Sequence, residues 1–271
     1  MINTTETENI CGLKRSDFQT TVGGKETDLY ILKNNQGNEV AITNYGGALV
    51  AIMVPDKNGN RANVIQGHDN IQDVINSPEP YLSTLVGRYG NRICKGRFQL
   101  HGKEYQLPIN NGPNCLHGGL KGFNAKVWEA LQMNEHTLVL KYVSPYGEEG
   151  FSGEMKVTVE YSFTDDNELV IEYMATTNKK TVVDYYLPID ETSIPTGEVR
   201  FVKGTPFDFR TPKTVGQDID ADHEQIKNGA GYDHCFVLNK KEEGELSFAA
   251  RIKEPVSGRT MEVYTTEPGV Q

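Results

Sequence analysis

The polar side chains best suited to binding a ligand are concentrated between residues 87 and 123. This segment reads GRYGNRICKGRFQLHGKEYQLPINNGPNCLHGGLKGF, and its glycines alternate with Arg88, Asn91, Arg92, Asn110, Asn111, Asn114 and His117. Glycine permits positive φ and a close approach of backbone to ligand, so planar amide, guanidinium and imidazole groups can converge there. We interpret the segment as a binding site for a small molecule rich in hydroxyl groups. The alternative is two hairpin turns that carry solvated polar side chains.

Three residues in glycine-rich turns could act together on such a molecule, namely Arg92, His117 and Asp233. Arginine and aspartate each offer paired hydrogen-bonding groups for adjacent hydroxyls of a hexose. Transformation of the sugar also needs a proton donor, and histidine suits that role near neutral pH. A structural role for His117 alone is equally consistent with its turn, but the N-x-x-H-G-G spacing favours function. The acidic pairs at 148–149 and 165–166 are expected to be solvated turn charges.

The elements that must position these residues are predicted to be β-strands joined by short turns. Residues 29–32 and 40–43 flank an N-Q-G-N turn, as in a hairpin, and the apolar run at 48–54 suits a strand buried on both faces. Apolar and polar residues alternate over 155–163 and again over 169–175, the period of a half-buried strand. These last two segments should pair as a hairpin, with the following side chains inward: Val157, Val159, Ile171 and Tyr173.

Helical patterns are confined to one short segment, residues 69–75. The chain is therefore predicted to be an all-β protein, an antiparallel β-sandwich in which residues 1–271 form a single domain. Trp128, the only tryptophan, could be a platform for a sugar face or a core residue, and the sequence favours neither.

Composition narrows the possible partners and location. The net charge of -10 opposes binding to nucleic acid or to an anionic membrane. The four cysteines lack any C-x-x-C pair, so neither a zinc ribbon nor a disulfide framework is indicated. No apolar run is long enough to span a bilayer, and the first thirty residues are polar, without a signal sequence. We expect a cytoplasmic protein with reduced thiols.

Several segments resemble the aldose 1-epimerases, also called galactose mutarotases, and they occur in the order found in that family. They cover nearly the whole chain, and N-R-I followed by L-H-G-G is the most specific combination. The matching segments are NYGG (44–47), GRYGNRI (87–93), NCLHGGLKGF (114–123), GEEG (147–150), LPIDETSIPTGE (187–198), TPFDFR (205–210), GYDH (231–234) and EPGVQ (267–271).

The resemblance implies a galactose-mutarotase-like supersandwich without metal or organic cofactor. It implies that Asn91 and Arg92 bind the sugar, that His117 is the first of two active-site histidines, and that Asp233 holds sugar hydroxyls with Gln271 near the pocket. In the family mechanism a glutamate takes the proton of the C1 hydroxyl while a histidine protonates the ring oxygen. The ring opens, the C1–C2 bond rotates, and closure on the other face gives the other anomer.

Two family segments have no counterpart in the sequence. The N-H-S-Y-F-N segment with the second histidine is missing where Val183 runs into Asp184, and the chain ends before the region that carries the glutamate base. The domain is therefore expected to be incomplete after residue 183 and at its C-terminus.

The leading hypothesis is an aldose 1-epimerase that interconverts the α and β anomers of hexoses such as galactose or glucose, as a monomer or homodimer. The rival is a non-catalytic carbohydrate-binding β-sandwich that has lost the acid and the base. A weaker alternative, action on a sugar phosphate, would require more arginines at the pocket.

Overall fold

The computed structural model describes residues 10–100, 102–177, 189–196, 198, 200 and 202–271. The chain divides into two compact units. Unit 1 comprises Met1–Asn91, Tyr105–Pro108 and His117–Lys180, and unit 2 comprises Arg92–Glu104, Ile109–Leu116 and Thr181–Gln271. The expectation of a single domain over residues 1–271 stays a prediction.

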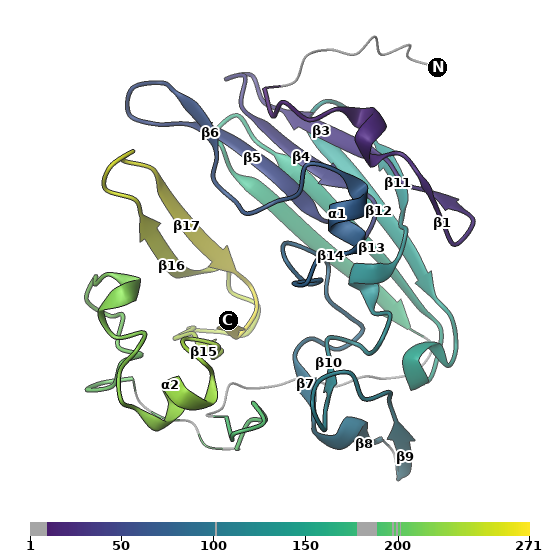
Figure 1. The fold of residues 1–271 in the computed structure, drawn as a ribbon, viewed down its shortest axis with the longest axis vertical. Coiled ribbons are helices and arrows are strands. Elements are labelled where there is room, and N and C mark those ends of the chain that lie inside the picture. The colour runs from purple at the N-terminus through teal and green to yellow at the C-terminus, as the bar shows by residue number, and fades with distance from the viewer. Residues whose placement is uncertain (1–9, 101, 178–188, 197, 199, 201) are drawn as a thin grey trace. The chain divides into compact units, whose positions relative to one another are not determined.

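Unit 1 is built on two four-stranded antiparallel sheets (Figure 1). One has the order β3 (Leu29–Lys33), β4 (Glu39–Thr43), β5 (Leu49–Pro55) and β6 (Arg61–Asn63). The other has the order β11 (Glu129–Gln132), β12 (Thr137–Ser144), β13 (Met155–Phe163) and β14 (Leu169–Thr177). The N-Q-G-N turn joins β3 to β4 with Leu32 opposite Val40, which confirms the predicted hairpin.

The two sheets of unit 1 share one apolar core, which makes them the layers of a sandwich. That core joins Leu32, Val40 and Ile42 of the first sheet to Leu138, Leu140, Val157, Val159, Tyr161 and Phe163 of the second. Each strand contributes alternate residues because successive side chains point to opposite faces. The predicted all-β antiparallel sandwich is confirmed.

A second apolar cluster covers the other face of the first sheet. Phe18 of the 3₁₀ turn η1 (Arg15–Phe18) and Ile71 and Val74 of helix α1 (Ile71–Ile75) pack with Ala41 and Val50. Helix α1 is the predicted helical turn, and the Asn70 side chain caps it by accepting from the Asp73 N–H at 3.0 Å.

Strand β4 is buried on both faces along its whole length, and β5 is buried on both faces only near its start. All residues of β4 are buried, whereas only Val50 and Ala51 of β5 are. The apolar run at 48–54 is thus a strand, and the prediction that both of its faces are buried holds at Val50 and Ala51, while the other residues of β5 are partly buried. The charged end of β4 is accommodated because Glu39 pairs with Lys33 at 2.8 Å.

Strands β13 and β14 form the predicted hairpin, with Val159 opposite Tyr173 and Tyr161 opposite Ile171. Val157 and Val159 are buried and Ile171 packs against the core, but Tyr173 is 66% exposed. Tyr173 therefore lies on the core face of the strand, but it is not buried there, contrary to the prediction. Strand β14 is the edge strand of its sheet in the described residues, and the residues that follow Ile171 in it, 172–176, are exposed.

Trp128 is a core residue and not a sugar platform. It is 1% exposed, its Nε1–H donates to the Phe123 carbonyl at 3.2 Å, and its ring meets the Phe123 ring edge to face at 5.5 Å. The remaining elements of unit 1 are short: the hairpin β1 (Thr21–Val22) and β2 (Lys25–Glu26), and the turns η3 (Phe123–Ala125) and η4 (Glu148–Gly150).

Unit 2 consists of short strand pairs and loops. Strand β7 (Arg92–Ile93) pairs with β10 (Cys115–Leu116), β15 (Phe236–Val237) with β18 (Gly269–Val270), and β16 (Ser247–Lys253) with β17 (Thr260–Thr265). The other elements are helix α2 (Glu224–Asn228) and the turns η2 (Cys94–Gly96) and η5 (Val215–Gln217). Strand β8 (Arg97–Leu100) pairs with β9 (Lys103–Gln106), the strand in which unit 2 gives way to the short segment Tyr105–Pro108 of unit 1.

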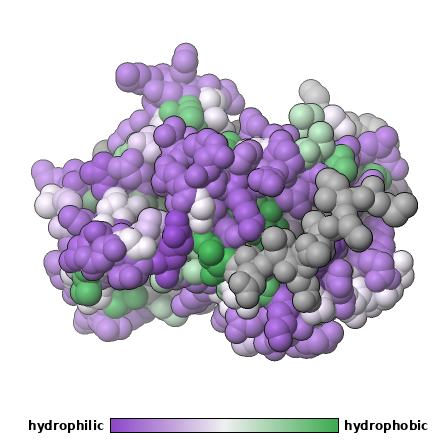
Figure 2. All heavy atoms as spheres, turned by 90° about the horizontal axis from the view of Figure 1, so that it is seen from above, coloured by the Kyte–Doolittle hydropathy of each residue, from purple (hydrophilic) through white to green (hydrophobic). Residues whose placement is uncertain are grey.

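The surface agrees with the polar composition. Hydrophilic side chains predominate on the face drawn in Figure 2. The four cysteines all lie within the described residues and form no disulfide there. Among the described residues, no helix has the length and apolar character needed to cross a membrane.

Candidate functional site

His117 and Asn91 are joined by two reciprocal hydrogen bonds in unit 1. The His117 backbone N–H donates to the Asn91 carbonyl at 3.0 Å, and the Asn91 N–H donates to Nδ1 of the His117 ring, also at 3.0 Å. Both residues have positive φ, 49° and 63°. Histidine and asparagine are among the residues other than glycine that adopt this conformation most readily. The structure thus brings two predicted site residues together.

The hydrogen bond from Asn91 fixes the protonation of the His117 ring. Because Nδ1 accepts a backbone N–H, the proton of the neutral imidazole must reside on Nε2. The half-buried ring also packs against Tyr81, with the ring centroids 4.5 Å apart and the planes inclined by 59°. His117 is therefore held as an oriented Nε2–H donor, the form that gives a hydrogen bond to a ligand oxygen.

The glycines beside His117 are required by close backbone packing. Gly118 has φ of 88°, and a Cβ there would lie 1.9 Å from the Gly87 carbonyl oxygen. A Cβ at Gly87 would in turn lie 2.3 Å from the Phe123 ring. Only glycine allows these segments to approach so closely, and this approach sets the position of the adjacent His117 backbone.

Arg92, Asp233 and Gln271 come together in unit 2. The Arg92 Nη1 lies 3.7 Å from Oδ2 of Asp233, and the Gln271 Nε2 donates to Oδ1 of Asp233 at 2.5 Å. Arg92 Nε also donates to Oδ1 of Asn111 at 2.9 Å. Pairing of β7 with β10 sets Arg92 opposite Leu116.

The charges of this group are partly accessible. The Arg92 side chain is 14% exposed and that of Asp233 is 43% exposed. At 3.7 Å their attraction is electrostatic, since a hydrogen bond requires a shorter separation. A carboxylate, an amide and a guanidinium at such distances suit recognition of adjacent hydroxyl groups. Convergence of this group with His117 and Asn91 on one pocket stays a prediction.

Other polar residues of segment 87–123 have structural partners. Asn110 brackets Leu116, accepting from its N–H at 2.7 Å and donating to its carbonyl at 3.0 Å, and Asn114 accepts from the Lys95 N–H at 3.1 Å and donates to the Thr192 carbonyl at 3.1 Å. Arg88 donates to the Ser144 hydroxyl and to the carbonyls of Ser144, Pro145, Ser152 and Gly153. Their abundance therefore reflects backbone satisfaction as well as any ligand site.

Glu148 is not the solvated turn charge that its sequence suggests. Its side chain is only 13% exposed, and it accepts hydrogen bonds from Lys126 at 2.6 Å, from the Tyr142 hydroxyl at 2.6 Å and from the Ser144 hydroxyl. Burial acts to raise the pKa of Glu148, but these three donors outweigh it and hold the pKa below its ordinary value. Asp165, by contrast, is exposed as predicted and accepts from Asn35.

Sequence reasoning also missed Gln225, which is 5% exposed and bonds to His234 at 3.1 Å. Its amide also bonds to Ile189, 36 positions away, so no local pattern marks it. His234 was visible within GYDH, but its burial was not. The junction at Val183, where the resemblance predicts a missing segment, lies outside the described residues.

The described geometry is accompanied by clear similarity to known proteins. The family model described as aldose 1-epimerase matches residues 28–185 and 182–271. Galactose mutarotase of Rattus norvegicus is 39% identical over 275 residues, which cover 92% of this chain and 78% of the rat protein. Aldose 1-epimerase of Escherichia coli (strain K12) is 31% identical with the same coverage.

Solved structures agree with the sequence comparisons. An aldose epimerase homologue from C. elegans superposes with a TM-score of 0.74 at 25% identity, covering 87% of this chain and 78% of that one. Galactose 1-epimerase from Lactobacillus acidophilus NCFM gives a TM-score of 0.71 at 27% identity, covering 81% and 72%.

The same comparisons locate a discontinuity. The two stretches that match the family model meet at residues 182–185, and the rat alignment runs over more positions than the 271 residues of this chain. Relatives therefore contain positions that this chain lacks, while the match extends over both sides of the junction. The chain belongs to the aldose 1-epimerase family.

Proposed function

We propose that this chain binds a hexose such as galactose or glucose and interconverts its α and β anomers by acid–base opening of the ring. The observation that carries the proposal is the orientation of His117, whose Nδ1 accepts from Asn91 and whose Nε2 therefore bears the proton. The names of the relatives from rat and Escherichia coli support the same reaction class.

In this proposal each group has a distinct task. Asp233, assisted by Gln271 and Arg92, would bind adjacent sugar hydroxyls through charge-assisted hydrogen bonds. His117 would donate a hydrogen bond from its Nε2–H to the ring oxygen and so stabilise the negative charge that develops there as the C1–O bond breaks. Asn91 would keep the imidazole in the donating tautomer. The proton that the C1 hydroxyl loses and the proton that the ring oxygen gains would be exchanged with water, because a neutral imidazole that gave up its Nε2 proton would be left as an unfavourable anion.

Polarimetry of freshly dissolved α-galactose tests the proposed activity. The wild-type chain should bring the anomers to equilibrium faster than buffer, and His117→Gln should lose that acceleration because it removes the imidazole Nε2–H from the ring oxygen. Removing one hydrogen-bond donor to a developing oxyanion typically costs ~10²–10³-fold in rate. Equal rates for wild type and His117→Gln would remove His117 from the chemistry.

A non-catalytic carbohydrate-binding role is the second candidate, and the discontinuity at residues 182–185 favours it. In the family resemblance the second histidine belongs there. A version with an N-H-S-Y-F-N segment inserted after Val183 should then accelerate mutarotation, while the 271-residue chain binds galactose without acceleration. If the 271-residue chain accelerates mutarotation over buffer as much as the version with the inserted segment does, the binding-only role is wrong.

The partner in either case is a small-molecule hexose. Cytoplasmic location and a monomeric or homodimeric state stay predictions.

A further inference from the structure

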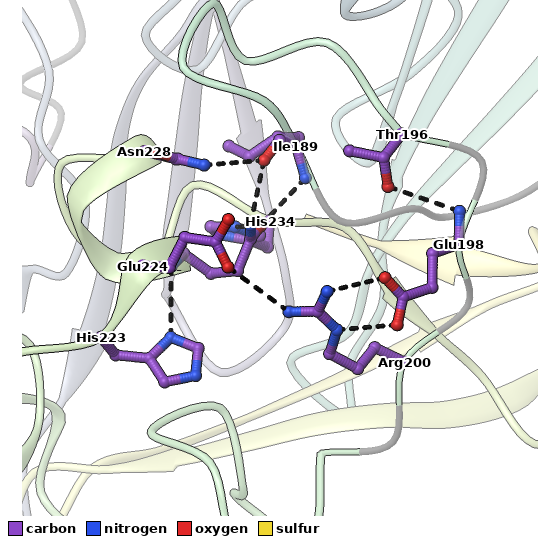
Figure 3. A network of polar contacts seen from close by, with 9 residues as sticks. Ile189, Thr196, Glu198, Arg200, His223, Glu224, Asn228 and His234 are labelled. Carbon is purple, nitrogen blue, oxygen red and sulfur yellow. Dashed lines mark hydrogen bonds and ion pairs between the residues drawn. The ribbon is translucent and has the colours of Figure 1, made fainter.

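A buried side-chain amide in unit 2 links two segments that are far apart in sequence. Gln225 lies in α2, and its amide brackets the backbone of Ile189: the Ile189 N–H donates to Oε1 at 3.0 Å, and Nε2 donates to the Ile189 carbonyl at 3.0 Å. The same Oε1 lies 3.1 Å from Nε2 of His234. Figure 3 shows His234 beside Ile189 within this network.

The backbone of Ile189 settles the proton positions. A peptide N–H can only donate and a carbonyl can only accept, so the two bonds to Ile189 assign the amide oxygen and nitrogen of Gln225 without ambiguity. Because Oε1 accepts, His234 must donate from Nε2. The neutral ring therefore leaves Nδ1 unprotonated, and that buried atom has no hydrogen-bond partner in the described structure.

The His234 ring is also confined by packing. It is 1% exposed and lies 4.5 Å from the Phe207 ring, centroid to centroid. Gly229 closes the other side, since a Cβ there would lie 2.7 Å from Cε1 of His234. Burial lowers the pKa of His234, and His223 adds to that effect while Asp233 opposes it. The ring is thus an immobile, neutral donor rather than a mobile acid.

Fixing His234 fixes the turn that carries Asp233. The His234 backbone N–H donates to the Tyr232 carbonyl at 2.9 Å, so Asp233 is the central residue of a tight turn. The Asp233 side chain is 43% exposed, and so its position depends on the turn rather than on packing of its own. This carboxylate contacts Gln271 and faces Arg92.

We propose that Gln225 is a positioning residue for sugar recognition: through His234 it holds the turn that presents the Asp233 carboxylate. The inference rests on the proposed function, because it assumes that Asp233 binds the sugar. Gln225 itself touches no ligand. The bond to Ile189 ties the same turn to the segment that follows the 182–185 junction.

Two substitutions separate this role from general support of the fold. Gln225→Leu removes the bonds to both Ile189 and His234. Asn228→Ala is the matched control, because Asn228 Nδ2 donates to the same Ile189 carbonyl at 2.9 Å from the same helix. Gln225→Glu is the conservative variant, since a protonated carboxyl group keeps an acceptor for His234 and the Ile189 N–H and a donor for the Ile189 carbonyl.

The measurements are NMR titration with galactose and ¹⁵N–¹H correlation of the histidine rings, with His234 assigned from His234→Gln. Gln225→Leu should weaken galactose binding about tenfold, the equivalent of one lost hydrogen bond, and abolish the Nε2–H signature of His234. Gln225→Glu and Asn228→Ala should retain the signature and bind galactose within about twofold of wild type. If Gln225→Leu fails to fold, Gly229→Ala displaces the ring directly and should weaken binding instead.

The outcomes distinguish this inference from the function on which it rests. If wild type binds galactose and Gln225→Leu binds it equally well, the positioning role is overturned. It is also overturned if Asn228→Ala weakens binding as much as Gln225→Leu, because the effect then belongs to Ile189. If wild type binds neither galactose nor glucose, the proposed function fails, and the role of Gln225 in sugar recognition fails with it.

Discussion

Neutralising Glu148 should destabilise unit 1 substantially. The substitution Glu148→Gln keeps the shape of the side chain but removes the charge that Lys126, Tyr142 and Ser144 share. The Lys126 ammonium would then lack its counter-ion in a site where its own side chain is only 18% exposed. A charge left without its partner is costly because the group cannot recover full hydration.

The magnitude follows from the contacts and the burial. Removing one member of a fully buried ion pair costs about 3–5 kcal/mol. Glu148 is 13% exposed, and glutamine retains one acceptor oxygen for Tyr142 or Ser144. We therefore expect a loss of about 2–3 kcal/mol, below the range for a fully buried pair. At about 2–4 °C per kcal/mol for a chain of this size, the melting temperature should fall by several degrees.

Thermal unfolding followed by circular dichroism at pH 7 measures this, with Asp165→Asn as the control in the same unit. Asp165 is an exposed carboxylate that accepts from Asn35, so its neutralisation should change stability little. The pKa of Glu148 is lowered in the folded state, so its contribution is present above the ordinary value of 4.5 and is lost as pH falls through the folded pKa. The difference between wild type and Glu148→Gln should therefore shrink below about pH 4.5. Equal melting temperatures for Glu148→Gln and Asp165→Asn at pH 7 would refute the reasoning.

Three further predictions concern the site, the backbone and the domain organisation. Arg92→Ala and Asp233→Ala should each weaken galactose binding by about 1.5–3 kcal/mol, and calorimetric titration with unchanged affinity for both would remove their assignment. Gly118→Ala should be far more destabilising than Gly147→Ala: both positions have positive φ, 88° and 82°, but only at Gly118 would a Cβ meet backbone, and similar melting temperatures would contradict this. If residues 1–271 form one domain, calorimetry should record a single cooperative transition, whereas two separate transitions would assign independent stability to the two units.

The β-sandwich of unit 1 could be predicted because strand periodicity is a local property. Alternation over residues 155–163 places Val157, Val159 and Tyr161 on the core side regardless of what lies opposite. The same pattern failed at Tyr173, where alternation identified the face correctly but could not show that the covering layer stops short of it. Periodicity therefore indicates which way a side chain points, and the neighbouring layer decides whether that side chain is buried.

The site divided along similar lines. The turn conformation of Asn91 and His117 could be predicted because positive φ leaves a local signal of glycines and asparagines, while their role in binding a sugar stays a prediction. Glu148 and Gln225 left no such signal. Their partners Lys126 and Ile189 are 22 and 36 positions away, so a buried acid and a buried amide look like ordinary surface residues in the sequence.

Side-chain amides perform a common task in this fold that explains why its asparagines and glutamines were hard to interpret. Gln225 brackets Ile189, Asn110 brackets Leu116, and Asn44 donates to the Glu26 and Trp128 carbonyls while accepting from the Asp28 N–H. Many connections here run between short strands, where buried peptide groups cannot all reach a sheet ladder and need another partner. An amide offers one acceptor beside a donor, as a peptide does, and so it can complete such pairings. A cluster of amides near a glycine-rich turn therefore identifies irregular backbone first, so a ligand role for one of them, such as Gln271 beside Asp233, has to be tested by substitution.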